Sequence, residues 1–556
     1  MYTHQTRNEL IEKSNSNIRE ITLVPGKLLP AVKSRPANSW APHIILAVCL
    51  LIFAIKALTS MVQESATWDE THYFGIGKYL LQTGKWDVEG SIIHPPLPYY
   101  LSSIPLLFFP TDKALWKHEP FYRAEPNIIG GQTLLSSPEN RGDHLLTLSR
   151  LMIVFVAMLL GCFVYLWAYK LYGSSGAISA IILYAFCPNI LANARLITPD
   201  IVITAFSFIT LYFFWKLLKN GRVMDAAFGG ISLGLALLSK HTGLLMLPVC
   251  IALALVYLWK YRSLPLRNCL IFGALGFVVL LLGYRFDLEP YFAGIALQQY
   301  KAHAGHWSFL LGECSLHGWW YYLLVAFVLK TPIAGMLFLV SAFFIYLWNI
   351  RKNGGFEELF LLVPAAIIFG FFSIYSEARG LRYILPVYPF LFVFAAGATR
   401  TLLSKKFLTA VYGVLIAWYI GASLYIHPHY LAYFNELAGG PDNGYRYLVD
   451  SNLDWGQDLK GLGRYMREHG ISKICLSYFG TDRPERYGIA YEWLPSEVLR
   501  NPSPGVQTVT LHDWVAISAT NLQGVYFENK DIYAMLRAKQ PVAKIGYSIF
   551  IYNLKN

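Results

Sequence analysis

The sequence predicts a polytopic α-helical membrane protein that carries a small α/β domain outside the membrane. Of its 556 residues, 55% are hydrophobic and only 14% are charged, whereas about 25% of an ordinary soluble domain is charged. The mean hydropathy is +0.41, and the hydrophobic residues gather in runs close to the roughly 20 residues that a helix needs to cross a bilayer. A soluble chain of this composition would aggregate, and disordered, collagen-like and coiled-coil proteins have other compositions.

About eleven apolar runs lie in the region 41–426, judged by that roughly 20-residue length. They lie near residues 41–61, 149–169, 175–192, 201–218, 223–239, 243–259, 268–284, 333–349, 357–375, 383–399 and 407–426. The first begins too late and runs too long for a signal peptide. The apolar stretch Trp319–Leu329 is short, so we expect it to lie at the interface or to re-enter. If it crossed, the C-terminus would change side.

Basic residues occupy alternate turns between these runs, where acidic residues are scarce. They are Lys170, Lys216, Lys219, Arg222, Lys260, Arg262, Arg267, Arg351, Lys352, Arg400, Lys405 and Lys406. The positive-inside rule places these turns in the cytosol. The net charge of +12 therefore reflects topology, and we expect no nucleic-acid partner. The polar tail 1–40 is then cytosolic, and the loops 62–148 and 285–332 lie outside together with the segment 427–556.

The C-terminal segment 427–556 is more polar than the membrane part. Strand-like runs at 474–479, 506–511 and 549–554 and a helical stretch at 456–468 predict a small α/β domain. Seven cysteines, mostly in or beside apolar runs, indicate neither a disulfide framework nor spaced metal ligands.

An acidic pattern opens this domain, Asp450-x-Asn452-x-Asp454-x-Gly456-x-Asp458. Alternating oxygen ligands are typical of a calcium loop, but the glycine is one place late for an EF-hand and the twelfth position is Gly461 rather than Glu. Alternatively, Asp454 caps a helix and Gln457 completes a capping box.

The first outer loop concentrates residues that could do chemistry. Asp69, Glu70 and His72 follow the first span. Asp69 and His72 share a face if a helix begins here, although Asp69 could simply cap that helix. About twenty residues later, two prolines fix the backbone beside His94. Taken singly, an acid pair in a loop is usually solvated and a histidine beside prolines is usually structural.

Further ionisable residues lie at the outward ends of the spans. They include Arg150, Arg195, Asp200, Lys240, His241 and Arg382. Ionisable groups at membrane depth are costly and are therefore candidates for function. The alternatives are anchoring at the interface and, for Asp200, an N-cap of the following span.

Together these residues resemble a known family. Asp69-Glu70-x-His72 followed by His94-Pro95-Pro96-Leu97 is similar to the first outer loop of the polyprenyl-phosphate-dependent protein O-mannosyltransferases (glycosyltransferase family 39), which are membrane enzymes of the GT-C fold. The resemblance continues at Arg150, Arg195–Asp200, Lys240 and Arg382, and it covers roughly residues 41–430. The more distant lipid A aminoarabinose transferases share this plan.

The chain departs from both groups before the prolines. Ile92-Ile93 stands where the eukaryotic mannosyltransferases carry Asp-Val, and Ile93-His94 stands where the aminoarabinose enzymes carry Glu-Lys. A carboxylate associated with metal binding in the latter group is therefore missing, so we expect no metal and no cofactor. The central lectin-like insertion of the eukaryotic enzymes is missing too.

The resemblance implies transfer of a sugar, with mannose as one candidate, from a polyprenyl-phosphate donor. The acceptor would be a hydroxyl of a protein, lipid or glycan on the outer face of a bacterial inner membrane, and the anomeric configuration would invert. The leaving phosphate is already ionised, so cations and one general base suffice.

The expected roles follow from that chemistry. We expect Asp69 to be the base and Glu70 to help or orient it, while Arg150, Lys240 and Arg382 bind the phosphate. His72, His94, Arg195 and Asp200 complete the expected substrate site, with Asp200 orienting a cation.

The rival class is a transporter or flippase for a lipid-linked substrate. A transporter would hold its ionisable residues near the bilayer midplane on broken helices, often within inverted repeats. Here they lie at the outward ends, and the sequence shows no repeat. A non-catalytic assembly subunit would not need the set from Asp69 to His94.

The charge pattern predicts that the C-terminal domain lies outside the membrane, because the basic turns must stay in the cytosol. A reporter that is active only in the cytosol, fused after Asn556, should be inactive. A cysteine placed near residue 470 should react with an impermeant reagent from outside. Labelling only after the membrane is opened would contradict this topology.

Overall fold

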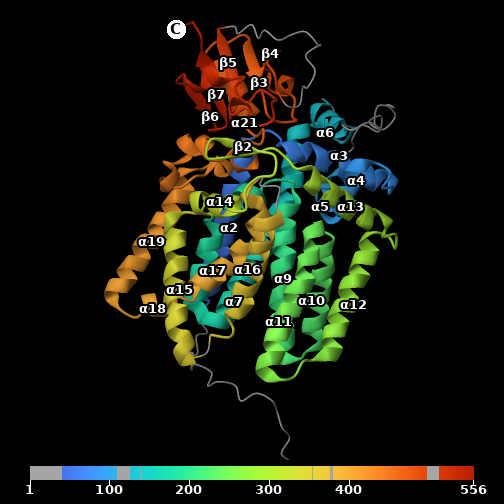
Figure 1. The fold of residues 1–556 in the computed structure, drawn as a ribbon, viewed down its shortest axis with the longest axis vertical. Helices are drawn as coiled ribbons and strands as arrows, with labels where there is room; N and C mark the ends of the chain where they lie inside the picture. Colours follow the sequence, from blue (N-terminus) through green and yellow to red (C-terminus); the bar gives the residue numbers. More distant parts are fainter. Residues whose placement is uncertain are drawn as a thin grey trace, which may run out of the picture. The chain divides into compact units, whose positions relative to one another are not determined.

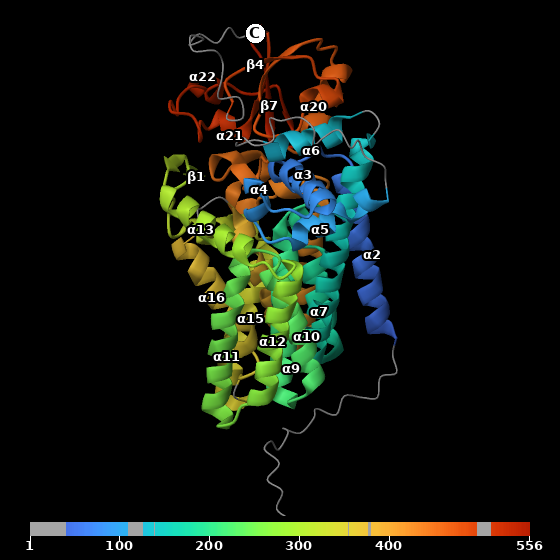
Figure 2. The ribbon, with the colours of Figure 1, turned by 90° about the vertical axis from the view of Figure 1, so that its right-hand side faces the viewer.

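The structure is a computed structural model, and it describes residues 40–108, 126–137, 140–353, 355–375, 380–496 and 513–555. From Ala41 onward the chain forms one unit. Long apolar helices lie side by side in this unit, and shorter helices and a β-sheet lie together at one end of them (Figure 1, Figure 2).

The apolar helices of the bundle are those that hydropathy predicts. They are α2 (Ala41–Met61), α7 (Gly142–Ala185), α9 (Pro199–Asn220), α10 (Val223–Leu237), α11 (Met246–Tyr261), α12 (Leu266–Gly283), α15 (Ile333–Asn353), α16 (Leu359–Tyr375), α17 (Tyr388–Ala396) and α19 (Lys406–Tyr425). The shortest of them, α17, belongs to the apolar segment Leu381–Leu402. Eight of the described helical segments are long and apolar enough to cross a membrane. The predicted multi-span helical membrane fold is confirmed at that level.

The count of eleven spans stays a prediction. The expected span 149–169 and most of the expected span 175–192 fall in the single element α7, and the second of them ends in the short helix at Pro188–Ala194. Helix α7 is interrupted where Gly173 adopts φ 74°, a left-handed conformation that favours glycine. The expected spans 223–239 and 357–375 are the shorter helices α10 and α16, of 15 and 17 residues. The stretch 319–329 contains α14 (Tyr322–Lys330), whose nine residues reach about 14 Å and cannot cross a core about 30 Å thick.

Short helices cover the end of the bundle next to the sheet (Figure 2). They are α3 (Trp68–Thr83), α4 (Glu89–Ile92), α5 (Leu97–Ser103), α6 (Pro126–Ser136), α8 (Pro188–Ala194) and α13 (Glu289–Ala304), with the 3₁₀ helices η1 (Ile104–Leu107), η5 (His241–Leu245), η6 (Leu381–Val387), η7 (Tyr430–Ala432), η8 (Glu436–Ala438), η9 (Pro441–Arg446), η10 (Asp450–Asn452) and η11 (Pro484–Tyr487). The short helix α18 (Thr399–Leu402) lies at the opposite end of the bundle (Figure 1). A hairpin of β1 (Ser308–Leu310) and β2 (Glu313–Ser315) follows α13.

The C-terminal part contains the predicted small sheet domain. Its strands are β3 (Ile474–Ser477), β4 (Tyr491–Trp493), β5 (Trp514–Ser518), β6 (Ala543–Ile545) and β7 (Ile549–Asn553), accompanied by α20 (Leu459–Glu468), α21 (Ala519–Leu522) and α22 (Ala534–Arg537). The order is β4-β3-β5-β7-β6; β3 is parallel to both its neighbours, and β7 is antiparallel to β5 and β6. Leu462 and Met466 of α20 belong to the same buried cluster as Ile474 and Ile551. The expected strand 506–511 lies outside the described residues.

Neither interpretation of the acidic pattern at 450–458 describes the structure. Asp454 accepts a hydrogen bond from the backbone N–H of Thr520 at 2.8 Å, and Asp458 accepts one from the Ser548 hydroxyl at 2.6 Å. Helix α20 begins only at Leu459, and Gln457 bonds to Leu453 and Trp455 rather than to Asp454. Within the described ranges, no three His, Cys, Asp or Glu side chains gather as a metal site. The carboxylates here join segments of the chain.

Candidate functional site

Glu70 is locked into the interior by the way α3 begins. Thr67 is the N-cap, and Glu70 closes a capping box by accepting the Thr67 backbone N–H at 2.9 Å. Arg150 of α7 donates to both carboxylate oxygens, at 2.8 and 2.6 Å, and the Ile197 N–H donates as well. Burial acts to raise the pKa of Glu70, but the Arg150 guanidinium and these hydrogen bonds outweigh it and lower that pKa. Glu70 is therefore an ionised structural anchor.

Arg150 is equally committed to structure. It is only 1% exposed, and besides Glu70 it donates to the carbonyl oxygens of Met61 and Ser65, both at 2.8 Å. The expected contact between Arg150 and a donor phosphate is thus not favoured by the geometry. Arg195 is also fully buried and forms an ion pair with Glu64. Neither arginine belongs to the lining of the cavity that contains Asp69 and Arg382.

That cavity, of about 980 Å³, brings together segments from across the chain. Its lining includes Asp69, His72 and Tyr73 of α3, His94 of the following loop, Lys240, His241 and Leu245 near η5, Gln298 and Lys301 of α13, Phe371, Phe372 and Tyr375 of α16, and Arg382 and Tyr383 of η6. One wall is polar and charged, and the wall from η5 and α16 is largely apolar. The cavity can therefore hold a ligand with a charged group attached to a hydrocarbon chain.

The charged wall is a chain of alternating signs. Arg382 Nη1 lies 2.8 Å from Asp69 Oδ2 and 3.8 Å from Asp200 Oδ2. Lys240 Nζ lies 3.0 Å from Asp200 Oδ1. Asp69 is 27% exposed, whereas Asp200 is 1% exposed. Neither Asp69 nor Asp200 is an N-cap, as the sequence had left open, because Thr67 and Thr198 hold the N-cap positions of α3 and α9.

Two of the expected histidines line the cavity as neutral groups. His72 Nε2 lies 3.2 Å from the Tyr99 hydroxyl, and the His94 ring stacks on Tyr73 at 5.7 Å. Burial lowers the pKa of His72 to about 4, and burial beside Lys240 and His241 lowers the pKa of His94 well below its usual range. Neutral imidazoles can both donate to and accept from hydroxyl groups.

Several buried polar atoms around this cavity have no hydrogen-bond partner among the described residues. They are the Tyr73 hydroxyl, His94 Nδ1, Asp200 Oδ2, His241 Nδ1 and Arg382 Nε. Buried polar groups are normally paired, so their concentration here fits a surface built for a polar ligand.

Sequence reasoning missed part of the lining. Gln298 and Lys301 belong to α13, which the sequence placed only in an outer loop, and no local motif marks them. Gln298 Nε2 donates to the Ile93 carbonyl at 2.7 Å, so α13 closes over the loop that carries His94. The Lys240 ammonium lies over the ring of Tyr383, 4.7 Å from the ring centre.

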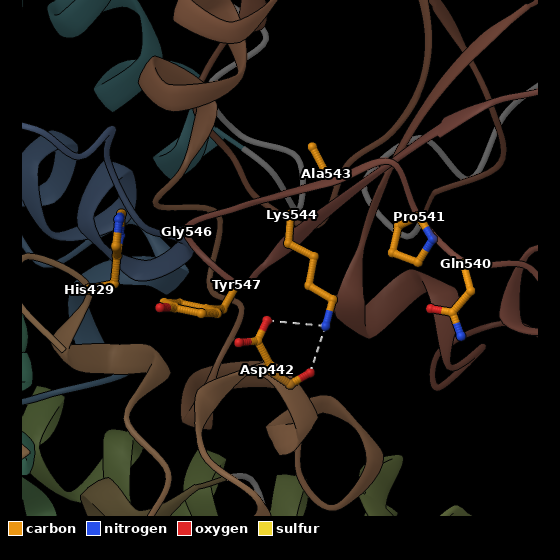
Figure 3. A pocket seen from close by; sticks show the side chains of 8 residues that line it. All are labelled: His429, Asp442, Gln540, Pro541, Ala543, Lys544, Gly546 and Tyr547. Atoms are coloured by element: carbon orange, nitrogen blue, oxygen red, sulfur yellow. Dashed lines mark hydrogen bonds and ion pairs between the residues drawn. The ribbon is translucent and has the colours of Figure 1, made fainter. Parts of the chain in front are cut away.

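A second cavity, of about 420 Å³, lies at the edge of the sheet domain (Figure 3). It is lined by His429, Asp442, Gln540, Pro541, Ala543, Lys544, Gly546 and Tyr547. Lys544 Nζ reaches the Asp442 carboxylate at 3.3 Å and its carbonyl at 2.7 Å. These charges satisfy each other, and none of the residues expected from the sequence lines this cavity, so the larger cavity is the candidate site.

Comparisons with known proteins point to one class. A family model described as dolichyl-phosphate-mannose-protein mannosyltransferase matches residues 143–284, a region that begins well after the loop motif at residues 69–97. The comparison with curated proteins finds no match. The family match supports the resemblance to the mannosyltransferases and the broad class, a membrane glycosyltransferase of the GT-C type.

The chain is also similar to solved structures at low identity. ArnT from Cupriavidus metallidurans, bound to undecaprenyl phosphate, is 13% identical over 93% of this chain and 98% of its own, with a TM-score of 0.47. The Archaeoglobus fulgidus oligosaccharyltransferase is 13% identical over 81% of this chain and 64% of its own, also at 0.47. The S. cerevisiae Pmt1-Pmt2 protein O-mannosyltransferase complex, bound to the sugar donor, matches 47% of this chain and 34% of its own at 16% identity and a TM-score of 0.31.

The neutral state of His72 predicts a pH-dependent stability. The unfolded chain binds a proton near pH 6.5, whereas the folded protein binds it only near a pKa of about 4. The unfolded state therefore holds more protons between these values, so stability should fall as the pH drops from 6.5 toward 4. Thermal unfolding of the detergent-purified protein at pH 7 and pH 5 measures this effect.

The matched variants are His72→Gln and His469→Gln, the latter at an exposed position that follows α20. We expect His72→Gln to flatten the pH dependence and His469→Gln to leave it unchanged. An unchanged slope in His72→Gln would show that His72 is not held neutral by burial.

Proposed function

We propose that the protein transfers a sugar from a polyprenyl-phosphate donor to an acceptor hydroxyl on the outer face of the inner membrane. The observation that carries this proposal is a single cavity that joins a paired-cation wall, an accessible carboxylate and an apolar wall. The family match over residues 143–284 supports the same class. The acceptor would be a protein, lipid or glycan hydroxyl, and mannose is one candidate for the sugar.

Lys240 and Arg382 are the proposed ligands of the donor phosphate. Both face the cavity, and the buried carboxylate of Asp200 lies between them and orients them. As the bond to the sugar breaks, negative charge grows on the phosphate, and two preorganised cations stabilise it. The apolar side chains of α16 and η5 would then take the first isoprene units of the donor.

Asp69 is the proposed general base. It is the more accessible carboxylate of the charged wall, and Glu70 has both oxygens occupied by Arg150, Thr67 and Ile197. Asp69 can accept the proton of the incoming hydroxyl while the bond to the anomeric carbon forms. Its contact with Arg382 holds the base next to the phosphate-binding cation.

His72 and His94 are the proposed partners of sugar hydroxyls. Their rings line the same cavity as Asp69, and His94 Nδ1 is buried without a partner among the described residues. The sequence suggested Arg150 and Arg195 as substrate ligands. In this proposal they instead stabilise the folded protein, by forming ion pairs with Glu70 and Glu64.

The role of Asp69 predicts a selective loss of turnover. Asp69→Asn keeps the size of the side chain and removes the basic oxygen, so transfer should slow by about 10²–10⁴-fold while the protein folds and binds donor. Single-turnover assays with purified protein and a lipid-linked sugar measure the rate. A wild-type rate in Asp69→Asn would exclude it as the base.

Glu70→Gln is the matched control, because it also replaces a carboxylate with the corresponding amide, at the neighbouring residue. It leaves Arg150 buried without a full counter-charge, and breaking such a pair costs about 3–5 kcal/mol. We expect a lower yield of folded protein but near-normal turnover in the fraction that folds. A slower chemical step at unchanged stability would make Glu70 part of the catalytic machinery.

The phosphate site predicts a defect in donor affinity. Lys240→Met keeps the chain length and removes the ammonium, and a hydrogen bond to a charged group contributes about 1.5–3 kcal/mol. The KM for donor should therefore rise roughly 10- to 100-fold, with a smaller change in the KM for acceptor.

Lys260→Met is the control, because Lys260 lies near the far end of the helical segment His241–Tyr261. It should bind donor as the wild type does. Equal donor affinity in Lys240→Met and the wild type would remove Lys240 from the phosphate site.

A further inference from the structure

We propose that the segment Asn452–Gln457 of the C-terminal part is a clamp that sets the distance between Asp69 and Arg382, with Trp455 as its central positioning residue. This inference rests on the proposed function, because it concerns the base and the phosphate-binding cation assigned there. It also gives a role to the acidic pattern of the sequence, whose carboxylates do not gather as a metal site among the described residues.

Trp455 supports Arg382 directly. The indole is 2% exposed, and the Arg382 guanidinium carbon lies 4.2 Å above the centre of one of its rings. A cation on an aromatic face is attracted by the ring quadrupole, which holds it against the ring. The guanidinium is thereby held where its Nη1 reaches Asp69 Oδ2 at 2.8 Å.

Asn452 fixes the backbone that carries Arg382. Its Oδ1 accepts the Leu381 N–H at 2.9 Å, and its Nδ2 donates to the Tyr322 hydroxyl at 2.8 Å. Lys330 Nζ donates to the Asn452 carbonyl. The start of η6 is therefore attached to the clamp and, through it, to α14.

The same segment holds the start of α3. The Trp68 N–H donates to the Trp455 carbonyl at 2.8 Å, and the Ser65 N–H donates to the Gln457 carbonyl at 2.9 Å. The Ser65 hydroxyl donates to the Gly456 carbonyl at 2.9 Å. Trp68 directly precedes Asp69, so the carbonyl of Trp455 positions the base while its ring positions the cation.

Gln457 stiffens the clamp from within. Its Oε1 accepts the Trp455 N–H at 2.8 Å, and its Nε2 donates to the Leu453 carbonyl at 2.9 Å. This side chain and the Gly456 turn, where φ is 87°, fix the shape of the segment by contacts within it. Because a misplacement of about 1 Å in reacting groups can cost about 10²-fold in rate, such a rigid link has a functional consequence.

The test is a double-mutant cycle on binding, with Trp455→Leu, Arg382→Gln and the double variant in the full-length, detergent-purified protein. The affinity for undecaprenyl phosphate is measured without turnover. We expect Trp455→Leu to weaken binding about tenfold in the wild-type background and to have no further effect once Arg382 is Gln. Trp455→Phe keeps an aromatic face and should lie between the wild type and Trp455→Leu, so it carries the test if the leucine variant does not fold.

Trp167→Leu is the matched control, because Trp167 is equally buried in α7 among Phe208, Tyr212 and Trp215. It should lower the unfolding temperature without changing affinity. Unchanged affinity in Trp455→Leu, or equal losses in both Arg382 backgrounds, would overturn the clamp while leaving the proposed function intact. If Arg382→Gln itself binds lipid phosphate normally, the proposed phosphate site is wrong instead.

Discussion

The buried ion pair between Glu70 and Arg150 is the interaction on which the rest of the site depends. It joins the start of α3 to α7, and both side chains are at most 1% exposed. Consecutive residues on a helix point about 100° apart, so turning Glu70 into the interior turns Asp69 toward the cavity. Removing either partner would leave a buried charge unpaired, at a cost of about 3–5 kcal/mol.

Beyond this ion pair, the site consists of acidic and basic side chains that alternate along one wall of the cavity. Asp69 contacts Arg382, Arg382 approaches Asp200, and Asp200 holds Lys240. Each cation is balanced by a carboxylate in the folded protein, which limits the cost of placing it next to an apolar wall. The histidines beside them stay neutral, so they add hydrogen-bonding capacity to the cavity without adding charge.

The sequence predicted the helical membrane fold because hydropathy is a local property, and each expected apolar run falls on a described helix. One cavity is lined by five of the residues that the sequence proposed for the site, Asp69, His72, His94, Lys240 and Arg382. Which acid faces that cavity could have been read from Thr67-x-x-Glu70, a capping-box pattern that assigns Glu70 to the helix start. The motif resemblance drew attention to the pair and not to its capping role.

Other features depend on contacts that one sequence does not reveal. Arg150 and Arg195 looked like substrate ligands because their counter-charges, Glu70 and Glu64, lie 80 and 131 residues away. The part of α13 in the lining and the stack of Trp455 on Arg382 are equally long-range. Gln457 was assigned to a capping box because its spacing from Asp454 fits one, but its side chain bonds to Trp455 and Leu453 instead.

The proposed activity is the transfer of a sugar to an acceptor on the outer face of the membrane, catalysed by the residues that line this cavity. The most direct measurement is mass-spectrometric glycan analysis of the cell envelope from cells with the protein, without it, and with Asp69→Asn at equal expression. If the cavity catalyses this transfer, a glycosylated product should be present only with the wild-type protein. Identical envelopes in all three strains, grown with the lipid-linked donor present, would contradict it.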